Sequence, residues 1–502
     1  MVMLAKPPLP TNYPFNSPGF LSPGQSVANT MLPWSPSATN PTFRINLPSS
    51  SDQLSLNPSL SPITNPEGLP QTTHLSNGTT ANALFMPNRQ QSSIYLSLPL
   101  SPELSANRML LSKMLLNGSD ETRQRVETLR NDGISLMVSP FLPGKLIVAM
   151  HGPAGKEREM AQAMLTLLLN PKWTPADFEQ TRQNITHSLE DFSRKPNLPL
   201  KVGMNRALYG ENQPYSLTPN QEIALMAQQT PQNLRTALQR VTQATSSAMI
   251  SIAAPLPTGL QLAILDQATQ ETGWLHNPFA AAKTPEISSA VSPQAFQKML
   301  FIPSDTLKRA QIELTFQAPP PGDRDYPAFL LLKNILAGHS EGSLFERLRT
   351  QDGLVYAAMV YGGMPLGQQS RYNASIEVDF DKIGPAASEL MAITRQLASQ
   401  PVSGATLETA KRRFLLTTRN SEQTASGTLA SNMPWMTSNL PPPPIAAMQN
   451  AIASITPADI QRISQRIFNT PNSIQLLGIS APSNVLRQWF PNAPIISPPL
   501  FG

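Results

Sequence analysis

A chain of 502 residues, 40% of them hydrophobic, is long enough to bury two or three separate cores. It has no cysteine, which excludes a disulfide framework and every zinc site built on thiolates. The net charge of +5 is small for this length, and the compact basic cluster of Lys411, Arg412 and Arg413 is typical of a solvated helix face. The composition therefore does not indicate a nucleic-acid partner.

The N-terminal part differs in composition from the rest. Its first 80 residues carry 14 prolines and only four charged side chains. Such a segment cannot bury a core of its own. We expect residues 1–82 to be extended or disordered, or to drape over a neighbouring domain. Prolines also interrupt the first eight residues, which argues against a signal peptide, and no run of 18 apolar residues indicates a membrane span. The sequence therefore predicts a soluble protein with no membrane partner.

A first domain is predicted over residues 83–255. Thr174 and Pro175 form the cap and first turn of a long helix, and Thr230 with Pro231 opens another. The predicted strands are 93–98, 145–151 and 248–254, and the predicted helices are 103–116, 156–169 and 176–192. Between them lies a turn at Asp132-Gly133 that is followed by a strand.

A second domain is predicted over residues 291–485. A linker at 256–290 separates it from the first domain, and a proline-broken tail follows at 486–502. The predicted strands are 311–316, 354–360, 370–379 and 473–479, and the predicted helices are 326–336, 385–398, 405–420 and 457–467. Four landmarks recur in the same order in both domains, at offsets of 218 to 226 residues. The sequence therefore predicts an α+β protein with two tandem homologous αβ-roll domains, each a mixed or antiparallel sheet with helices packed on one face.

The clearest local signal is the stretch 343–360. Leu344, Phe345 and Leu348 have helical spacing, Gly353 can supply the positive φ that ends a helix, and a strand follows. This corner places Arg349, in the last helical turn, near Tyr356, early in the strand. Either residue alone is usually solvated or packed. Together they can offer donors to a peptide carbonyl or to a developing oxyanion.

The chain has no recognisable catalytic apparatus of its own. Its five histidines are scattered, and a zinc hydrolase needs two imidazoles close in space plus a carboxylate. The nearest match is His187 with Glu190 and Asp191, where an aspartate stands in place of a second histidine. His339, before the central helix, is more simply a polar loop residue. Neither a P-loop, a dinucleotide fingerprint nor a nucleophile elbow occurs in the sequence.

The run from Leu336 to Tyr356 resembles the pitrilysin/insulinase family of inverted-motif zinc metallopeptidases. It shares that family's glycine-rich loop, Leu-Phe, Leu-Arg and Gly-Leu-x-Tyr pattern. In the family, the residues matching Arg349 and Tyr356 hold substrate across a closed chamber, and zinc is bound in another domain by a His-x-x-Glu-His motif. That motif is absent here, so the resemblance implies the C-terminal half of such an enzyme, either a truncated product or one side of a split enzyme.

Further expectations follow from the resemblance alone. They are that this chain binds no metal or cofactor, that zinc lies in an N-terminal half or partner subunit, and that the ligand is a peptide. The lead-in and the segment between Leu69 and Pro99 are most similar to the branch of the family that processes the precursor peptide of pyrroloquinoline quinone. We expect the bacterial cytoplasm rather than the periplasm, because the sequence shows no signal peptide.

Two alternatives stay open. One is a catalytically inactive peptidase-like scaffold or peptide-binding subunit, like the core subunits of respiratory complexes that share this fold. The retained Arg349 and Tyr356 pair argues against a pure scaffold. The other is an independent hydrolase with an unrecognised site, against which the scattered histidines count.

Overall fold

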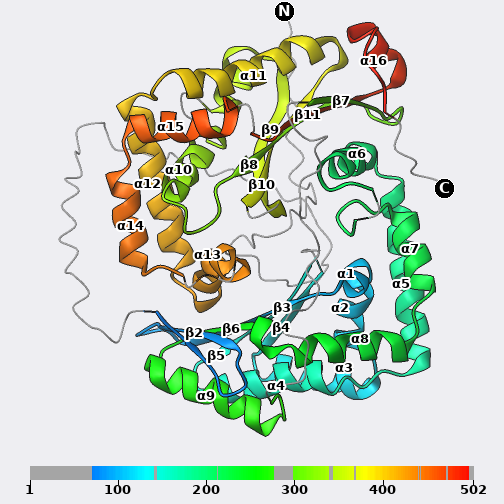
Figure 1. Cartoon of the computed structure of the whole chain (residues 1–502), viewed down its shortest axis with the longest axis vertical. Helices are drawn as coiled ribbons and strands as arrows, with labels where there is room; N and C mark the ends of the chain where they lie inside the picture. The colour runs from blue at the N-terminus through cyan, green and yellow to red at the C-terminus, as the bar shows by residue number, and fades with distance from the viewer. Residues whose placement is uncertain are drawn as a thin grey trace, which may run out of the picture.

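The computed structural model describes residues 70–140, 144–211, 213–275, 298–338, 343–366, 369–438, 440, 442–470 and 473–496. Two β-sheets face each other, and most helices cover their outer sides (Figure 1). We call residues 70–275 the first roll and residues 298–496 the second roll.

Apart from β1 (Gln71–His74), the extra edge strand of the first sheet, the two sheets have the same strand order. The first is β1, β2 (Thr80–Phe85), β6 (Met249–Ala254), β3 (Gln91–Pro99), β5 (Lys145–Pro153) and β4 (Ser135–Ser139). The second is β7 (Lys298–Pro303), β11 (Gln475–Ala481), β8 (Ala310–Ala318), β10 (Gln369–Val378) and β9 (Val355–Leu366). Leaving out β1, each sheet has one parallel pair, β2 with β6 or β7 with β11, and is otherwise antiparallel. The predicted α+β class with a repeated mixed sheet is confirmed.

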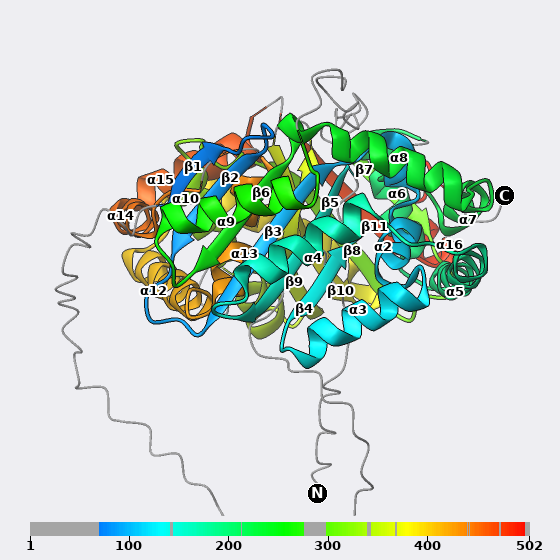
Figure 2. The ribbon, with the colours of Figure 1, turned by 90° about the horizontal axis from the view of Figure 1, so that it is seen from below.

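The helices of the first roll are α1 (Pro102–Ala106), α2 (Arg108–Asn117), α3 (Asp120–Asn131), α4 (Glu157–Leu169), α5 (Pro175–Ser193), α6 (Leu198–Tyr209), α7 (Pro219–Ala227), α8 (Pro231–Gln243) and α9 (Thr258–Glu271). Those of the second are α10 (Tyr326–Leu336), the π-helix η4 (Glu346–Gln351), α11 (Ile383–Ser399), α12 (Gly404–Ser421), α13 (Ala425–Thr437), α14 (Ile445–Ser454), α15 (Pro457–Phe468) and α16 (Ser483–Trp489). Helices other than α6 and α13 lie on the outer side of the sheets (Figure 1). Figure 2 shows α3, α4 and α9 lying over the first sheet.

The predicted caps form as expected. The side chains of Thr174, Thr230 and Thr456 each accept a hydrogen bond from the backbone N–H three residues on, and a proline occupies the first helical position after each. The amphipathic helices that they open bury their apolar faces against the sheets. Ile460, Ile463 and Ile467 of α15, for example, lie in the core of the second roll.

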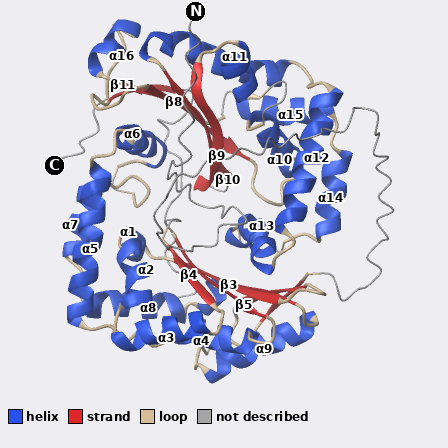
Figure 3. Cartoon of the chain, turned by 180° about the vertical axis from the view of Figure 1, so that it is seen from behind, coloured by secondary structure: helices blue, strands red, loops and turns tan. Residues whose placement is uncertain are grey.

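One helix of each roll packs on the inner face of the other roll's sheet or beside it. Leu200, Met204 and Leu208 of α6 form a stripe with a spacing of four residues, and they join a core cluster with strands of the second sheet. Ala425 and Leu429 of α13 do the same with the first sheet. Figure 3 shows α6 and α13 between the two sheets. Each roll is therefore completed by a helix of the other.

Some predicted boundaries differ from the structure. Residues 258–271, expected as linker, form α9, which packs against α4 and β2 because Leu265 and Ala268 are apolar and buried. Strand β1 and the start of β2 fall within the expected lead-in of 1–82, and α16 begins within the expected second domain and runs into the expected tail. Residues 1–69 of the lead-in lie outside the described residues. No helix in the described part of the chain is long and apolar enough to cross a membrane.

Candidate functional site

The corner at residues 343–356 begins with a π-helix. In the first roll, Asp132 N–H donates to the Thr128 carbonyl four residues back, whereas Asp352 N–H donates to the Arg347 carbonyl five residues back. The second corner has one residue more between its leucine and its glycine than the first. The π-helix absorbs this extra residue. Both corners then close in the same way, with Gly133 at φ +76° and Gly353 at φ +61°.

Tyr356 lies in a β-bulge. On the neighbouring strand β10, Val378 pairs with Val355 and Glu377 pairs with Ala357, so Tyr356 has no partner in the ladder. Strand β9 is also the outermost strand of its sheet. A bulge turns a side chain away from the regular alternation of a strand, and bulges are frequent beside functional sites.

Arg349 and Tyr356 are in contact, as the seven-residue separation predicts. The guanidinium of Arg349 donates a hydrogen bond through Nη1 to the backbone carbonyl of Tyr356. Its centre lies 5.5 Å from the Tyr356 ring and 5.3 Å from the Phe345 ring. Both Arg349 and Tyr356 are partly exposed. The structure thus brings the pair together, and its binding of substrate stays a prediction.

Arg309 completes this cluster, and sequence reasoning missed it. Its guanidinium lies 4.3 Å from the centre of the Tyr356 ring, and its Nε donates to Asp379 at 3.0 Å. That hydrogen bond raises the pKa of Arg309. No local pattern marks this residue, because Asp379 lies 70 positions away in the chain. We refer to Arg309, Arg349, Tyr356 and Asp379 as the corner cluster.

A second polar group lies farther along the inner face of the same sheet. Arg371 and Glu313 form an ion pair at 3.3 Å with side chains only 7% and 9% exposed. Arg371 also donates to Asn373, at 3.1 Å, and to Asn205 of α6. Burial raises the pKa of Tyr361 well above its usual value, and its bond to the Glu313 carboxylate raises it further. This group of buried side chains ties the second sheet to a helix of the first roll.

The three histidines that the structure describes are not arranged as a metal site. His151 Nδ1 lies 2.9 Å from Ser93 Oγ, and burial lowers the pKa of His151 to about 4. His187 lies on the exposed side of α5, 3.4 Å from Glu190. His339 falls outside the described residues. Within the described ranges no three His, Cys, Asp or Glu side chains are close enough together to hold a metal ion.

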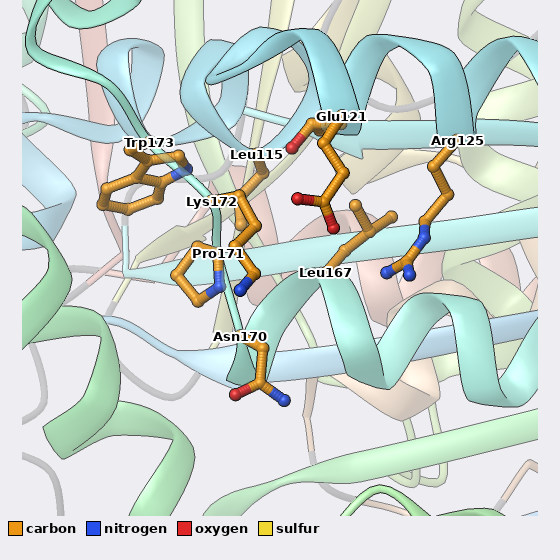
Figure 4. Close-up of a pocket in the computed structure, with 9 residues that line it drawn as sticks. Leu115, Glu121, Arg125, Leu167, Asn170, Pro171, Lys172 and Trp173 are labelled. Carbon is orange, nitrogen blue, oxygen red and sulfur yellow. The ribbon is translucent and has the colours of Figure 1, made fainter.

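Two cavities lie away from the corner cluster. One of about 10 Å³ sits between α3 and the end of α4, with Glu121, Arg125 and Lys172 around it (Figure 4). This volume accommodates no more than one water molecule. The other, of about 260 Å³, is an open groove between α5 and α7 that Arg182 and Ile223 help to line. His187 also lines this groove, but neither Arg349 nor Tyr356 lines either cavity.

Comparison with known proteins supports the fold and, for one segment of the chain, a relation to inactive peptidase domains. Residues 267–414 match the family model described as the peptidase M16 inactive domain. The matched segment includes Arg309, Arg349, Tyr356 and Asp379. No curated protein is similar enough in sequence to count as a match.

Solved structures match over most of the chain. A protease from Helicobacter pylori has a TM-score of 0.68 at 13% identity, covering 82% of this chain and 100% of its own. A peptidase M16 inactive domain from Pseudomonas fluorescens has a TM-score of 0.67 at 15% identity, covering 82% and 98%. A putative M16-like peptidase from Alicyclobacillus acidocaldarius has a TM-score of 0.63 at 13% identity, again covering 82% and 98%. The chain therefore has the same overall fold as these solved structures.

Proposed function

We propose that this chain is the non-catalytic, substrate-enclosing half of a zinc metalloendopeptidase, in which Arg349 and Tyr356 hold an extended peptide. The corner cluster carries the proposal, because it joins both side chains at the edge of a sheet within a segment that matches an inactive peptidase domain. A phenol and a guanidinium are donors suited to a peptide carbonyl or to a developing oxyanion. Both are partly exposed and thus within reach of a ligand.

The zinc belongs to a partner in this proposal. The His-x-x-Glu-His motif does not occur in the 502 residues, so we assign the metal and the general base to an N-terminal half or a separate subunit. The solved structures with this fold are covered over 98–100% of their own length, so a chain with only these two rolls occurs among them. We place the assembled enzyme in the bacterial cytoplasm.

A finer proposal concerns the substrate. The lead-in and the segment between Leu69 and Pro99 resemble pyrroloquinoline quinone biosynthesis protein F, whose relatives process a small precursor peptide. We therefore propose that precursor as the peptide. Cleavage assays on the precursor and on an unrelated peptide of equal length, with the reconstituted enzyme, would test this choice. Equal rates for both would contradict it.

Reconstitution tests the main proposal. The chain is co-purified with a zinc-bearing partner and peptide cleavage is measured with and without it. The isolated chain should contain no stoichiometric zinc and cleave nothing, whereas the complex should be active. One tightly held zinc per isolated chain, or full activity of the partner alone, would contradict a half-enzyme.

A second candidate is an inactive peptidase-like scaffold or peptide-binding subunit. It is favoured by the hydrogen bond from Arg349 to the backbone of Tyr356, because this donor already serves the protein's own chain. The two candidates differ in one measurement. The measurement is kcat of the complex with wild-type Tyr356 and with an altered Tyr356. If the chain is a scaffold, kcat should be the same in both; if it is a substrate-enclosing half, kcat should change.

A further inference from the structure

Arg309 lies next to Tyr356 without belonging to its sequence motif. It directly precedes β8, and its guanidinium is closer to the Tyr356 ring than that of Arg349, at 4.3 Å against 5.5 Å. A guanidinium at this distance from a tyrosine ring is attracted by the negative face of the ring. The contact thus joins the start of β8 to the start of β9, two strands that have β10 between them.

The sheet register holds Arg309 in place. Ala310 pairs with Val378 in the ladder between β8 and β10, so Arg309 and Asp379 are the next residues beyond this pair. Their side chains form a 3.0 Å ion pair, with Arg309 37% and Asp379 56% exposed. An exposed ion pair alone restrains a side chain weakly. Arg309 is held by two contacts together, to the Asp379 carboxylate and to the Tyr356 ring.

Tyr356 needs such a restraint because of its bulge. A residue in a regular ladder has its side-chain direction set by its pairing, but Tyr356 has no ladder partner. Arg349 binds the backbone carbonyl of Tyr356, which leaves the ring itself to be held by other contacts. Of the two guanidinium groups beside that ring, that of Arg309 is the nearer.

We propose that Arg309 is a positioning residue for Tyr356, fixed by Asp379 and orienting the phenol toward the bound peptide. Arg349 restrains the backbone of Tyr356 and Arg309 restrains its ring. The inference rests on the proposed function for what Tyr356 contacts. The orientation of the ring by Arg309 can be measured without any ligand.

The test combines two readouts on the full chain. Labelling with 3-fluorotyrosine gives a ¹⁹F spectrum of eight tyrosines, in which Tyr356→Phe identifies one resonance. Peptide affinity is measured by fluorescence anisotropy with a fluorescein-labelled, unstructured 20-residue peptide with a blocked C-terminus. Both are recorded for Arg309→Met, Arg309→Lys and Asp379→Asn. Arg347→Met is the matched control. Arg347 lies on the same π-helix as Arg349, but its side chain pairs with Glu389 of α11.

In Arg309→Met and Asp379→Asn, the Tyr356 resonance should shift, and the peptide Kd should rise about two- to fivefold, the scale of one cation–π contact. Arg309→Lys keeps the charge but loses the planar fork, so its Kd should lie in between. Arg347→Met should change neither readout. Thermal unfolding of each variant establishes that the fold is retained.

The possible failures are distinguishable. An unchanged Tyr356 resonance in both Arg309→Met and Arg309→Lys would overturn the positioning role, whatever the peptide does. A shifted resonance with unchanged Kd would overturn its importance for the ligand. If the wild-type chain binds no peptide while the resonance still shifts, the contact is upheld and the peptide-binding part of the proposed function fails.

Discussion

The guanidinium of Arg371, on the second sheet, donates a hydrogen bond to the side-chain oxygen of Asn205, on a helix of the first roll. The two residues are 166 positions apart in the chain. Arg371 is also paired with Glu313 of the neighbouring strand β8, and both side chains are buried. A buried ion pair within the second roll therefore includes the arginine whose hydrogen bond reaches the first roll.

Replacing Arg371 with methionine should be strongly destabilising. It leaves the Glu313 carboxylate, 9% exposed, without its cation, and the loss of one partner of a buried ion pair typically costs ~3–5 kcal/mol. Chemical denaturation measures this change. The double variant Arg371→Met/Glu313→Gln should recover a substantial part of the loss, since the unpaired charge is removed.

The matched control is Arg130→Met. Arg130 pairs with Glu127 on α3, and their side chains are 70% and 55% exposed. The substitution should therefore lower the free energy of unfolding by less than ~1 kcal/mol. Equal losses for Arg371→Met and Arg130→Met would show that the buried ion pair of Arg371 with Glu313 contributes nothing specific.

Stability should fall between neutral and acid pH because of His151. Burial lowers its pKa to about 4, against ~6.5 in the unfolded chain. Between these values the unfolded state binds more protons than the folded state. The stability that depends on a neutral His151 is therefore fully present above about pH 6.5. As the pH falls toward 4, the free energy of unfolding should decrease by up to about 3 kcal/mol.

Denaturation of the wild type and of His151→Gln at pH 7, 5.5 and 4.5 checks this. The glutamine can still bond to Ser93 but does not titrate, so the difference between the two proteins should change with pH in the stated direction. His187→Gln, which alters a histidine with 78% of its side chain exposed, is the control. A parallel pH dependence in His151→Gln and wild type would contradict the assignment.

Gly353→Ala should destabilise the corner. Its φ of +61° is a left-handed conformation, which costs a non-glycine residue roughly 1–2 kcal/mol, although a Cβ would touch no neighbour within 4 Å. Gly404→Ala is the control, because this position opens α12, and a Cβ there also meets nothing. That variant should be neutral or slightly stabilising. Thermal unfolding compares the two, and similar losses would refute the conformational argument.

Tyr356→Phe should impair catalysis in the complex with a zinc-bearing partner and leave folding intact. It removes one donor and keeps the ring and its cation contacts. If the phenol binds only in the transition state, kcat should fall roughly 10- to 1000-fold. Arg349→Lys keeps the charge but loses the planar fork that reaches the Tyr356 carbonyl, so it should lower activity as well.

Steady-state kinetics of the reconstituted complex, with separate kcat and KM, give the answer. Arg347→Met again serves as the control, since its partner Glu389 lies on α11. Wild-type rates for both Tyr356→Phe and Arg349→Lys in an active complex would mean that the corner is only structural.

Features with a local cause could be predicted from the sequence. The caps at Thr174 and Thr456 follow from a threonine and a proline at fixed spacing, and the corners follow from a glycine that tolerates positive φ. Arg349 and Tyr356 are in contact because a separation of seven residues across a helix–strand corner keeps their side chains close together. The duplication was visible because both copies keep these local signals in the same order.

Other features were decided only by the tertiary structure. Helix α9 has no strong amphipathic signal, and its residues were expected as linker, yet packing against α4 buries Leu265 and Ala268. Helices α6 and α13 have apolar stripes that predict burial. Their sequences do not indicate that each packs against the sheet of the other roll. That choice depends on how the two rolls dock.

The same distinction holds at the site. The sequence by itself determined the pair Arg349 and Tyr356, whose proximity is set by short-range geometry. Only the tertiary structure added Arg309, because its contact with Tyr356 depends on the register of β8 against β10 and on a bulge in β9. Register and bulges arise from pairing between distant strands, where the energy of many side-chain contacts, and not any local motif, selects one alignment.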